Sequence, residues 1–422
     1  MKIFHLGDLH LGKVVHGISM TDADQPFWIK SFLETVDVQK PDAVVIAGDI
    51  YDRKIPSPEA MELFDALLSG LAQREVYVLA VPGNHDSAQR LAHVSGLLQS
   101  SNIFIAGRLK RDMMHVTIND GQRDVTFWLM PYLFPAMVGE KNVLDRDDLA
   151  SYNAAAKAYI EAQAINPEHV NVLVAHQNVL ASGLAPEHSG SESLVGGLGE
   201  IDYSVFDVFD YVALGHIHNE QAMGRQTLRY AGCPLYYDFS EVNREKKLLA
   251  VDINGKEDIT ISKLDIQLLH RMKQLAGTVD EIIEQGKTLE NKEGLYIQAV
   301  VRDKHIKTGD LERMKEMLGA NLINIKREII SAEDRASGLP AAGGTVITAH
   351  KRSIMEEFDD FYQTQENELL DEYQEKLIAK IAEQQDNAGD WLDSEAGITE
   401  ADTEELVQLL LEAADSEMEG QA

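Results

Sequence analysis

Short β-rich runs alternate with helical patterns through residues 1–250, and this alternation limits the fold more than any other feature of the chain. Predicted strands lie at 2–6, 43–47, 76–81, 125–130, 172–175 and 211–214, and predicted helices at 26–38, 57–72, 87–99 and 149–164. Strand patterns at 228–231 and 248–253 follow each other closely, with turn residues between them, which indicates a second, more antiparallel sheet. We therefore expect an α/β fold in which two sheets form a sandwich flanked by helices.

The chain has 422 residues, which favours two or three domains. The α/β pattern defines a first domain at 1–264, and a change of pattern defines a small α+β capping domain at 265–335. Beyond these, we expect a flexible linker at 336–352, an amphipathic partner-binding helix at 353–384, and an acidic tail at 385–422 that holds one further candidate helix.

The charge of the chain is strongly negative, with a formal net value of −32. Residues 351–422 hold 22 acidic against 4 basic residues, a net of −18, so this C-terminal segment dominates the total. The charge argues against a general affinity for nucleic acid, but an acidic site can hold divalent cations, which attract phosphate.

The cysteine content and the hydropathy indicate the cellular compartment that we expect for the chain. The single Cys233 excludes an intramolecular disulfide and fits a reducing cytoplasm. No apolar run approaches the roughly 18 residues of a membrane span, so we expect no membrane partner.

Polar clusters follow five of the predicted strands. They are Asp8-Leu9-His10, Gly48-Asp49, Gly83-Asn84-His85-Asp86, Ala175-His176 and Gly215-His216-Ile217-His218. Taken singly, each is more often a helix cap, a turn or a satisfied polar residue. Because the carboxyl ends of parallel strands meet at one sheet edge, all five together predict a metal centre. Mixed carboxylate, imidazole and amide ligands suit Mn²⁺, Fe or Zn more than Ca²⁺.

In this order, the motifs resemble the calcineurin-like metallophosphoesterase superfamily, and within it the double-strand-break repair nucleases. The more specific likeness lies at 47–53, 81–87, 210–218, 232–235 and 239–241, and it covers residues 1–265 strongly. The resemblance implies a DNA nuclease, with double-strand exonuclease and single-strand or hairpin endonuclease activity, in DNA repair, recombination and replication. It also implies a homodimer that works with the SMC-like ATPase SbcC.

The same resemblance implies a role for each site residue. One metal ion would be held by Asp8, His10, Asp49 and His218, and a second by Asp49, Asn84, His176 and His216, with Asp49 bridging two Mn²⁺, Mg²⁺, Fe or Zn ions. His85 would protonate the leaving oxygen, Asp86 would orient His85, and Asp52 would bond a ligand imidazole from behind.

The sequence motifs indicate the type of reaction more specifically than they indicate the substrate. Arg225, Arg229 and Tyr230 follow the last histidine motif and are candidates for contacts to a DNA strand, although ordinary sheet-edge surface explains them equally well. A small-molecule or phosphoprotein phosphoesterase of the same superfamily is the alternative function. A non-catalytic scaffold is a third alternative, disfavoured because no ligand position is lost.

Two contacts with other chains are also predicted. The homodimer would use the helices at 57–72 and 87–99, which carry apolar stripes, although both helices must also pack on their own sheet. The helix at 353–384 would lay its apolar stripe on the SbcC coiled coil, and the alternative is that it folds back on the small domain.

Overall fold

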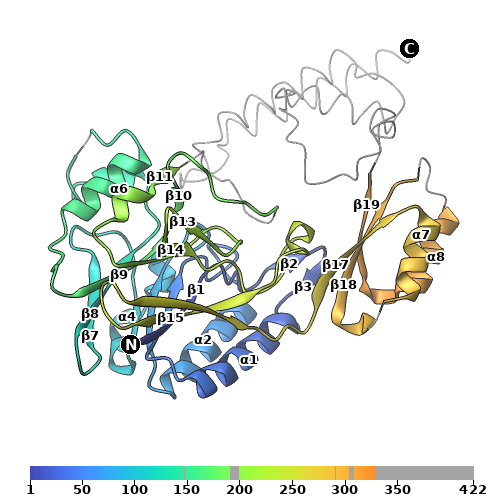
Figure 1. The fold of residues 1–422 in the computed structure, drawn as a ribbon, viewed down its shortest axis with the longest axis horizontal. Coiled ribbons are helices and arrows are strands. Elements are labelled where there is room, and N and C mark those ends of the chain that lie inside the picture. Colours follow the sequence, from blue (N-terminus) through green and yellow to red (C-terminus); the bar gives the residue numbers. More distant parts are fainter. Residues whose placement is uncertain (147, 191–198, 290, 304–307, 329–422) are drawn as a thin grey trace, which may run out of the picture. The chain divides into compact units, whose positions relative to one another are not determined.

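The structure is a computed structural model that describes residues 1–146, 148–190, 199–289, 291–303 and 308–328 (Figure 1). The predicted linker, partner-binding helix and acidic tail lie outside the described residues. Within the described residues, no helix is both long and apolar enough to cross a membrane.

The first sheet has six strands in the order β16-β15-β1-β4-β5-β6. Its parallel part is β1 (Lys2–Leu6), β4 (Ala43–Ala47), β5 (Tyr77–Val81) and β6 (Ile103–Ile105), and its antiparallel edge is β15 (Lys247–Ile253) and β16 (Ile259–Asp265). Every residue of β4 is buried. An unbroken apolar run in a parallel strand is typical of a sheet that is covered on both faces.

The second sheet has the order β13-β14-β12-β9-β8-β7. Its parallel strands are β14 (Arg225–Tyr230), β12 (Tyr211–Gly215), β9 (Val170–His176) and β8 (Asp124–Met130), and its antiparallel edges are β13 (Gln221–Met223) and β7 (Met114–Asn119). The strands predicted at 228–231 and 248–253 therefore do not share one antiparallel sheet. The connection between β14 and β15 crosses from the second sheet to the first.

The two sheets pack face to face around a shared apolar core. Val45 and Leu79 of the first sheet meet Phe127 and Val172 of the second in this core, and all four are buried. Their burial removes apolar surface from water on the inner face of both sheets, which is the main favourable term in such a sandwich.

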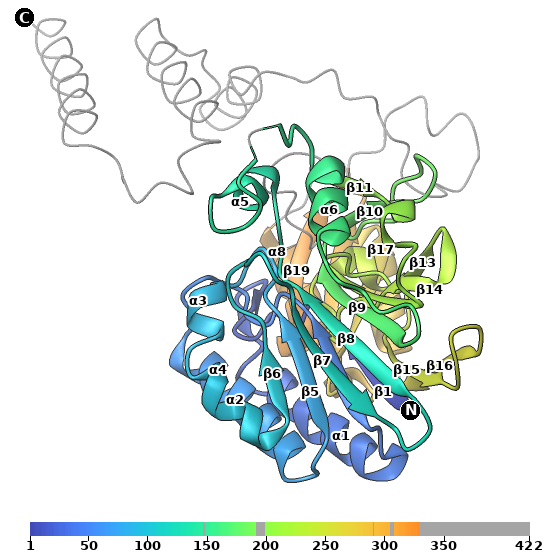
Figure 2. The same cartoon turned by 90° about the vertical axis from the view of Figure 1, so that its left-hand side faces the viewer.

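Helices cover the two outer faces (Figures 1 and 2). On the first sheet, α1 (Asp24–Gln39) and α2 (Pro58–Ala72) bury Phe32 and Leu67 against the outward side chains of β1, β4 and β5. On the second, α6 (Tyr152–Glu161) buries Tyr159. The predicted helix-flanked sandwich is confirmed, and α2 begins as predicted, with the Ser57 hydroxyl accepting from Ala60 N–H at 3.3 Å.

The helix predicted at 87–99 is interrupted. It forms as two short pieces, α3 (Ala88–Leu91) and α4 (Ser95–Leu98), because Val94 between them adopts a left-handed φ of 58°. The sequence around the break contains His93, Val94, Ser95 and Gly96, which are weak helix formers. Short elements elsewhere are β2 (Val14–Val15), β3 (Ile18–Ser19), α5 (Pro135–Gly139), β10 (Asn178–Leu180) and β11 (Glu200–Asp202).

A small unit at 271–327 has an apolar cluster of its own. It runs β17 (Arg271–Gly277), α7 (Val279–Lys287), β18 (Leu295–Val301), α8 (Thr308–Leu318) and β19 (Leu322–Arg327), and its three strands are parallel. Ile282, Ile297 and Met314 are fully buried within it. Parallel neighbouring strands need long crossover connections, which are usually helices, and this explains the alternating pattern of the segment.

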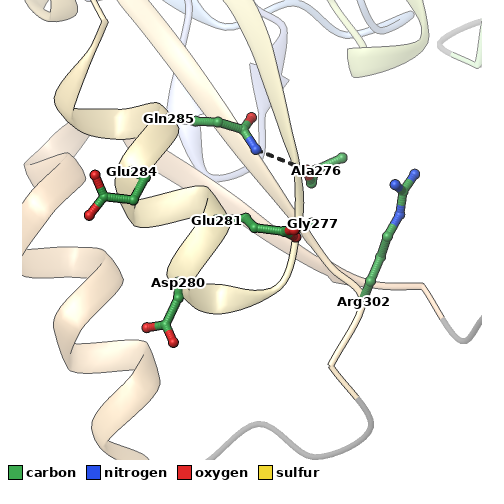
Figure 3. Close-up of a pocket in the computed structure, with 7 residues that line it drawn as sticks. All are labelled: Ala276, Gly277, Asp280, Glu281, Glu284, Gln285 and Arg302. Atoms are coloured by element: carbon green, nitrogen blue, oxygen red, sulfur yellow. Dashed lines mark hydrogen bonds between the residues drawn. The ribbon is translucent and has the colours of Figure 1, made fainter.

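A hollow of about 550 Å³ lies on the small unit beside α7 (Figure 3). Its lining residues are Ala276, Gly277, Asp280, Glu281, Glu284, Gln285 and Arg302. Several of their polar groups are engaged within the unit, since Glu281 accepts from Thr278 N–H at 2.7 Å and Arg302 pairs with Glu328 at 2.7 Å. We assign this hollow no role.

Candidate metal centre

The carboxyl ends of strands from both sheets meet at one edge of the sandwich. All seven predicted metal ligands lie there, after β1, β4 and β5 of the first sheet and at the ends of β9 and β12 of the second: Asp8, His10, Asp49, Asn84, His176, His216 and His218. Most of these side chains are buried. Buried carboxylates and imidazoles at such density are expected only where they pair with one another or hold a cation.

Two loops of this edge adopt an unusual backbone. Asp8, His10 and Asp49 have φ values of 55°, 43° and 48°, in the left-handed region. The loops are held together by backbone bonds, because Asp8 N–H donates to Gly48 O at 3.1 Å and His10 N–H donates to Asp49 O at 2.9 Å. Strained backbone of this kind persists where the surroundings over-determine it, and it is concentrated at functional sites.

Gly48 is required by this backbone for two reasons. Its φ is +83°, and a Cβ at this position would overlap the ring of His176. Gly121 in the β7–β8 turn has nearly the same φ, +86°, but among the residues that the structure describes none lies within 4 Å of the added Cβ. Substitutions at the two glycines should therefore differ in effect: at Gly121 a side chain adds backbone strain alone, whereas at Gly48 it also displaces the ring of His176.

We expect Gly121→Ala to lower the free energy of unfolding by about 1–2 kcal/mol, the cost of a left-handed L-residue, and to leave divalent-cation binding unchanged. Gly48→Ala should cost more and should also weaken cation binding, because it displaces His176. Chemical denaturation and calorimetric titration with Mn²⁺ measure the two effects. Equal losses of stability with unchanged cation binding in both variants would contradict the steric account.

The carboxylate of Asp49 lies between two groups of side chains. Its Oδ2 is 3.6 Å from His10 Nε2 and 3.4 Å from His176 Nε2. Its Oδ1 accepts from the backbone N–H of His85 at 3.0 Å. One oxygen of Asp49 is therefore shared by imidazoles that come from different sheets.

Each group around Asp49 contains nitrogen and oxygen donors that face one another. On one side, His10 Nε2 and His218 Nε2 are 3.1 Å apart. On the other, Asn84 Oδ1 lies 2.9 Å from His176 Nε2 and 3.2 Å from His216 Nδ1. Asp8, His10 and His218 could hold one metal ion, and Asp8, Asp49 and His176 form a second such group. The donor chemistry fits divalent transition-metal ions better than Ca²⁺.

The second ring nitrogen of three of these imidazoles faces an oxygen acceptor. His176 Nδ1 is 2.9 Å from Ala47 O, His10 Nδ1 is 3.5 Å from Asp52 Oδ1, and His218 Nδ1 is 3.8 Å from Glu241 Oε1. The hydrogen bond to Ala47 O keeps the proton on Nδ1 of His176 and turns its Nε2 lone pair inward. The carboxylates of Asp52 and Glu241 lie at ion-pair distance and favour the same arrangement in His10 and His218 through their charge. The structure places the Asp52 carboxylate behind His10, at ion-pair distance from its Nδ1. Sequence reasoning missed Ala47 O and Glu241, since a backbone carbonyl leaves no trace in the sequence and Glu241 lies outside the histidine motifs.

The electrostatics of the site favour neutral rings at His10 and His216, and a protonated ring at His176 beside the ionised carboxylate of Asp49. Burial lowers the pKa of His10 to about 4 and that of His216 to about 3. Burial also acts to lower the pKa of His176, but the carboxylates of Asp49 and Asp8 outweigh it and raise that pKa to about 9. The pKa of Asp49 is held well below its usual value by the nearby imidazoles, against the effect of burial. The negative charge of Asp49 therefore attracts either a proton on His176 or a metal cation.

His85 differs from the buried ligands because its side chain is partly exposed. Its Nδ1 lies 2.9 Å from the backbone O of Asp52, and its Nε2 lies 4.0 Å from Asp49 Oδ2. The ring also makes an edge contact with His10, with centroids 4.9 Å apart. His85 thus borders the site with one nitrogen anchored and the other directed to it.

The expectation that Asp86 orients His85 is corrected by the structure. The Asp86 carboxylate accepts from the backbone N–H groups of Gly83 at 2.9 Å, Ile50 at 3.0 Å and Tyr51 at 2.9 Å. Burial and then the charge of Asp49 raise its pKa to about 6. Asp86 thus joins the loops that carry Asp49 and His85.

The three candidate DNA contacts are structural instead. Tyr230 is 0% exposed, and its hydroxyl donates to Gln177 O at 3.0 Å and accepts from Val179 N–H at 2.7 Å. Arg229 is 6% exposed and forms an ion pair with Glu220. Arg225 donates to backbone carbonyls that include Phe209 O at 2.6 Å. Because these groups are buried or engaged, they are not placed to meet a nucleic-acid strand.

Comparison with known proteins identifies relatives over most of the chain. Residues 1–220 match the calcineurin-like phosphoesterase family. A nuclease SbcCD subunit from Staphylococcus epidermidis is 25% identical over 385 residues, which cover 90% of this chain and 98% of that protein. The crystal structure of TT1561 from Thermus thermophilus has a TM-score of 0.35 and 12% identity, covering 62% of this chain and 98% of that one. The chain belongs to the calcineurin-like phosphoesterase family.

Proposed function

We propose that this chain is a Mn²⁺-dependent DNA nuclease that hydrolyses phosphodiester bonds at DNA ends and hairpins. The observation that carries the proposal is the Asp49 carboxylate oxygen shared between two groups of metal-binding side chains. Support for DNA as the substrate comes from the staphylococcal relative, a nuclease by name, whose likeness spans both the sandwich and the small unit.

In this proposal, seven residues bind the metal ions and one residue supplies a proton. Asp8, His10, Asp49 and His218 would hold one cation, and Asp49, Asn84, His176 and His216 a second. Two cations held by these residues would supply an activated water molecule and would neutralise the charge that develops on the phosphate. Neutral Asn84 moderates the negative charge of the site. His85 borders the site, partly exposed, and would donate a proton from Nε2 to the leaving oxygen.

One matched assay separates the nuclease from the alternative phosphoesterase. Purified full-length chain with Mn²⁺ is given duplex DNA ends, DNA hairpins, a nitrophenyl phosphodiester and a nitrophenyl phosphomonoester. A nuclease cleaves both DNA substrates and the diester but leaves the monoester. Turnover of the monoester without cleavage of DNA would reject the nuclease in favour of a phosphatase.

We also propose two protein contacts. The relative belongs by name to SbcCD, which supports an SbcC-type ATPase as the partner of the helix predicted at 353–384, outside the described residues. A homodimer is supported by apolar side chains left exposed on both predicted interface segments, with Leu97 76% and Val94 50% exposed at the interrupted helix and Met61 47% exposed on α2. Leu67 and Leu91, by contrast, are used in the chain's own core.

We expect the wild-type chain to scatter light as a dimer at micromolar concentration, because burying Leu97 and its neighbours on a second copy removes apolar surface from water. Leu97→Glu should shift the mass to that of a monomer. Leu184→Glu is the matched control, since Leu184 is 72% exposed but lies outside the predicted interface. A monomeric wild type, or equal effects of both substitutions, would contradict this dimer.

A further inference from the structure

A buried carboxylate lies behind one imidazole of the metal centre. Glu241 ends the short turn Phe239–Glu241 and is 0% exposed. Its Oε1 lies 3.8 Å from Nδ1 of His218, whereas Nε2 of the same ring faces His10 at 3.1 Å. Glu241 therefore lies on the nitrogen of His218 that does not face the centre.

The charge of Glu241 is balanced inside the protein. Lys246, with a side chain only 5% exposed, donates from Nζ to Glu241 Oε2 at 2.8 Å. The backbone N–H of Tyr237 donates to the same oxygen at 3.2 Å. An ionised carboxylate without such partners would be strongly unfavourable at this depth, so these donors stabilise Glu241 as an anion.

The same cluster could be taken for a third metal site, because Cys233, His218 and Glu241 offer ligand atoms within 4.8 Å of one another. The ammonium of Lys246 argues against this interpretation. It lies 2.9 Å from Cys233 Sγ as well as 2.8 Å from Glu241 Oε2. The chain thus supplies the cation of this cluster itself, and the carboxylate remains available to His218.

We propose that Glu241 is a positioning residue of the metal centre, which fixes the ring of His218 with its Nε2 lone pair inward, and that Lys246 is its buried counter-ion. The inference rests on the metal centre proposed above. A carboxylate on the far nitrogen of a ligand histidine orients the ring and strengthens it as a ligand. Loss of Glu241 should therefore weaken the cation site that contains His218.

The test compares a single and a double variant of the full chain. Glu241→Met removes the carboxylate and leaves Lys246 buried without its anion, which should lower the midpoint of thermal unfolding measured without metal. Glu241→Met/Lys246→Met removes both charges and should recover most of that stability. Calorimetric titration with Mn²⁺ should show affinity about 10–100-fold lower at one site in both variants, the usual effect of losing such a partner.

Asp120→Asn is the control. The Asp120 side chain is 10% exposed and pairs with Arg123 at 3.4 Å, but it lies in the turn before β8, at the end of that strand away from the metal centre. Its loss should leave Mn²⁺ affinity unchanged.

Recovery of affinity together with stability in the double variant would show that Glu241 only supports the fold, and it would overturn the proposal. Unchanged affinity in Glu241→Met would overturn it as well. A wild-type chain that binds no Mn²⁺ would reject the metal centre itself, and with it this inference. Wild-type binding with equal affinity in every variant would reject the inference alone.

Discussion

Asp49→Asn should abolish phosphodiester cleavage and remove bound metal at the same time. One oxygen of Asp49 lies within 3.6 Å of His10 Nε2 and within 3.4 Å of His176 Nε2, so a single substitution affects both groups of ligands. The amide carries no charge, and it offers a donor where a cation needs an acceptor. We expect activity to fall by about 10³-fold or more, since charge stabilisation in the transition state is lost with the cations.

Elemental analysis of the purified variant and a cleavage assay with Mn²⁺ measure the two losses together. Asp120→Asn serves again as the control, because it exchanges the same functional groups remote from the centre. A variant of Asp49 that keeps a full complement of metal would contradict its position between two cations.

His85→Gln should reduce turnover of DNA by roughly 10²–10⁴-fold, the usual contribution of a positioned general acid, while both cations and DNA binding are retained. The expectation follows from its position at the border of the centre. His85 Nδ1 is anchored at 2.9 Å on Asp52 O, and its Nε2 is 4.0 Å from Asp49 Oδ2, which is too far for a direct bond to that carboxylate.

The choice of substrate separates proton transfer from metal binding. A nitrophenyl diester releases a stable anion that needs no proton, so the deficit of the His85 variant should shrink on that substrate. Rates on both substrates, together with metal content, decide the matter. An equal deficit on DNA and on the nitrophenyl diester, or loss of metal from the variant, would rule out His85 as the acid.

The edge that carries the candidate site could be predicted because it follows from local patterns. Short apolar strands such as Ala43–Ala47 are recognisable from composition, and the polar residues after them converge because parallel strands share one edge. Asp49 and His176 were brought together by that argument alone, although 127 positions of sequence separate them.

Two of the errors share a physical cause: the side chains bond to backbone groups, and such bonds leave no signature in the sequence. Asp86 is adjacent to His85 in the chain, yet its partners are the backbone N–H groups of Gly83, Ile50 and Tyr51. Tyr230 looked available for DNA, yet its hydroxyl joins two backbone groups of the neighbouring segment. The break at Val94 has a different cause, since it depends on the left-handed backbone of a single residue.

The left-handed backbone at Asp8, His10 and Asp49 has a consequence for how such a site can change during evolution. Among L-residues, this conformation is tolerated best by asparagine, aspartate and histidine, and it is strongly unfavourable for β-branched or bulky side chains. Most substitutions at these three positions therefore destabilise the fold through backbone strain, whatever their effect on metal binding. Glycine aside, the residue types that this backbone tolerates best are themselves able to bind metal ions, so substitutions that keep a side chain at these positions tend to exchange one ligand for another.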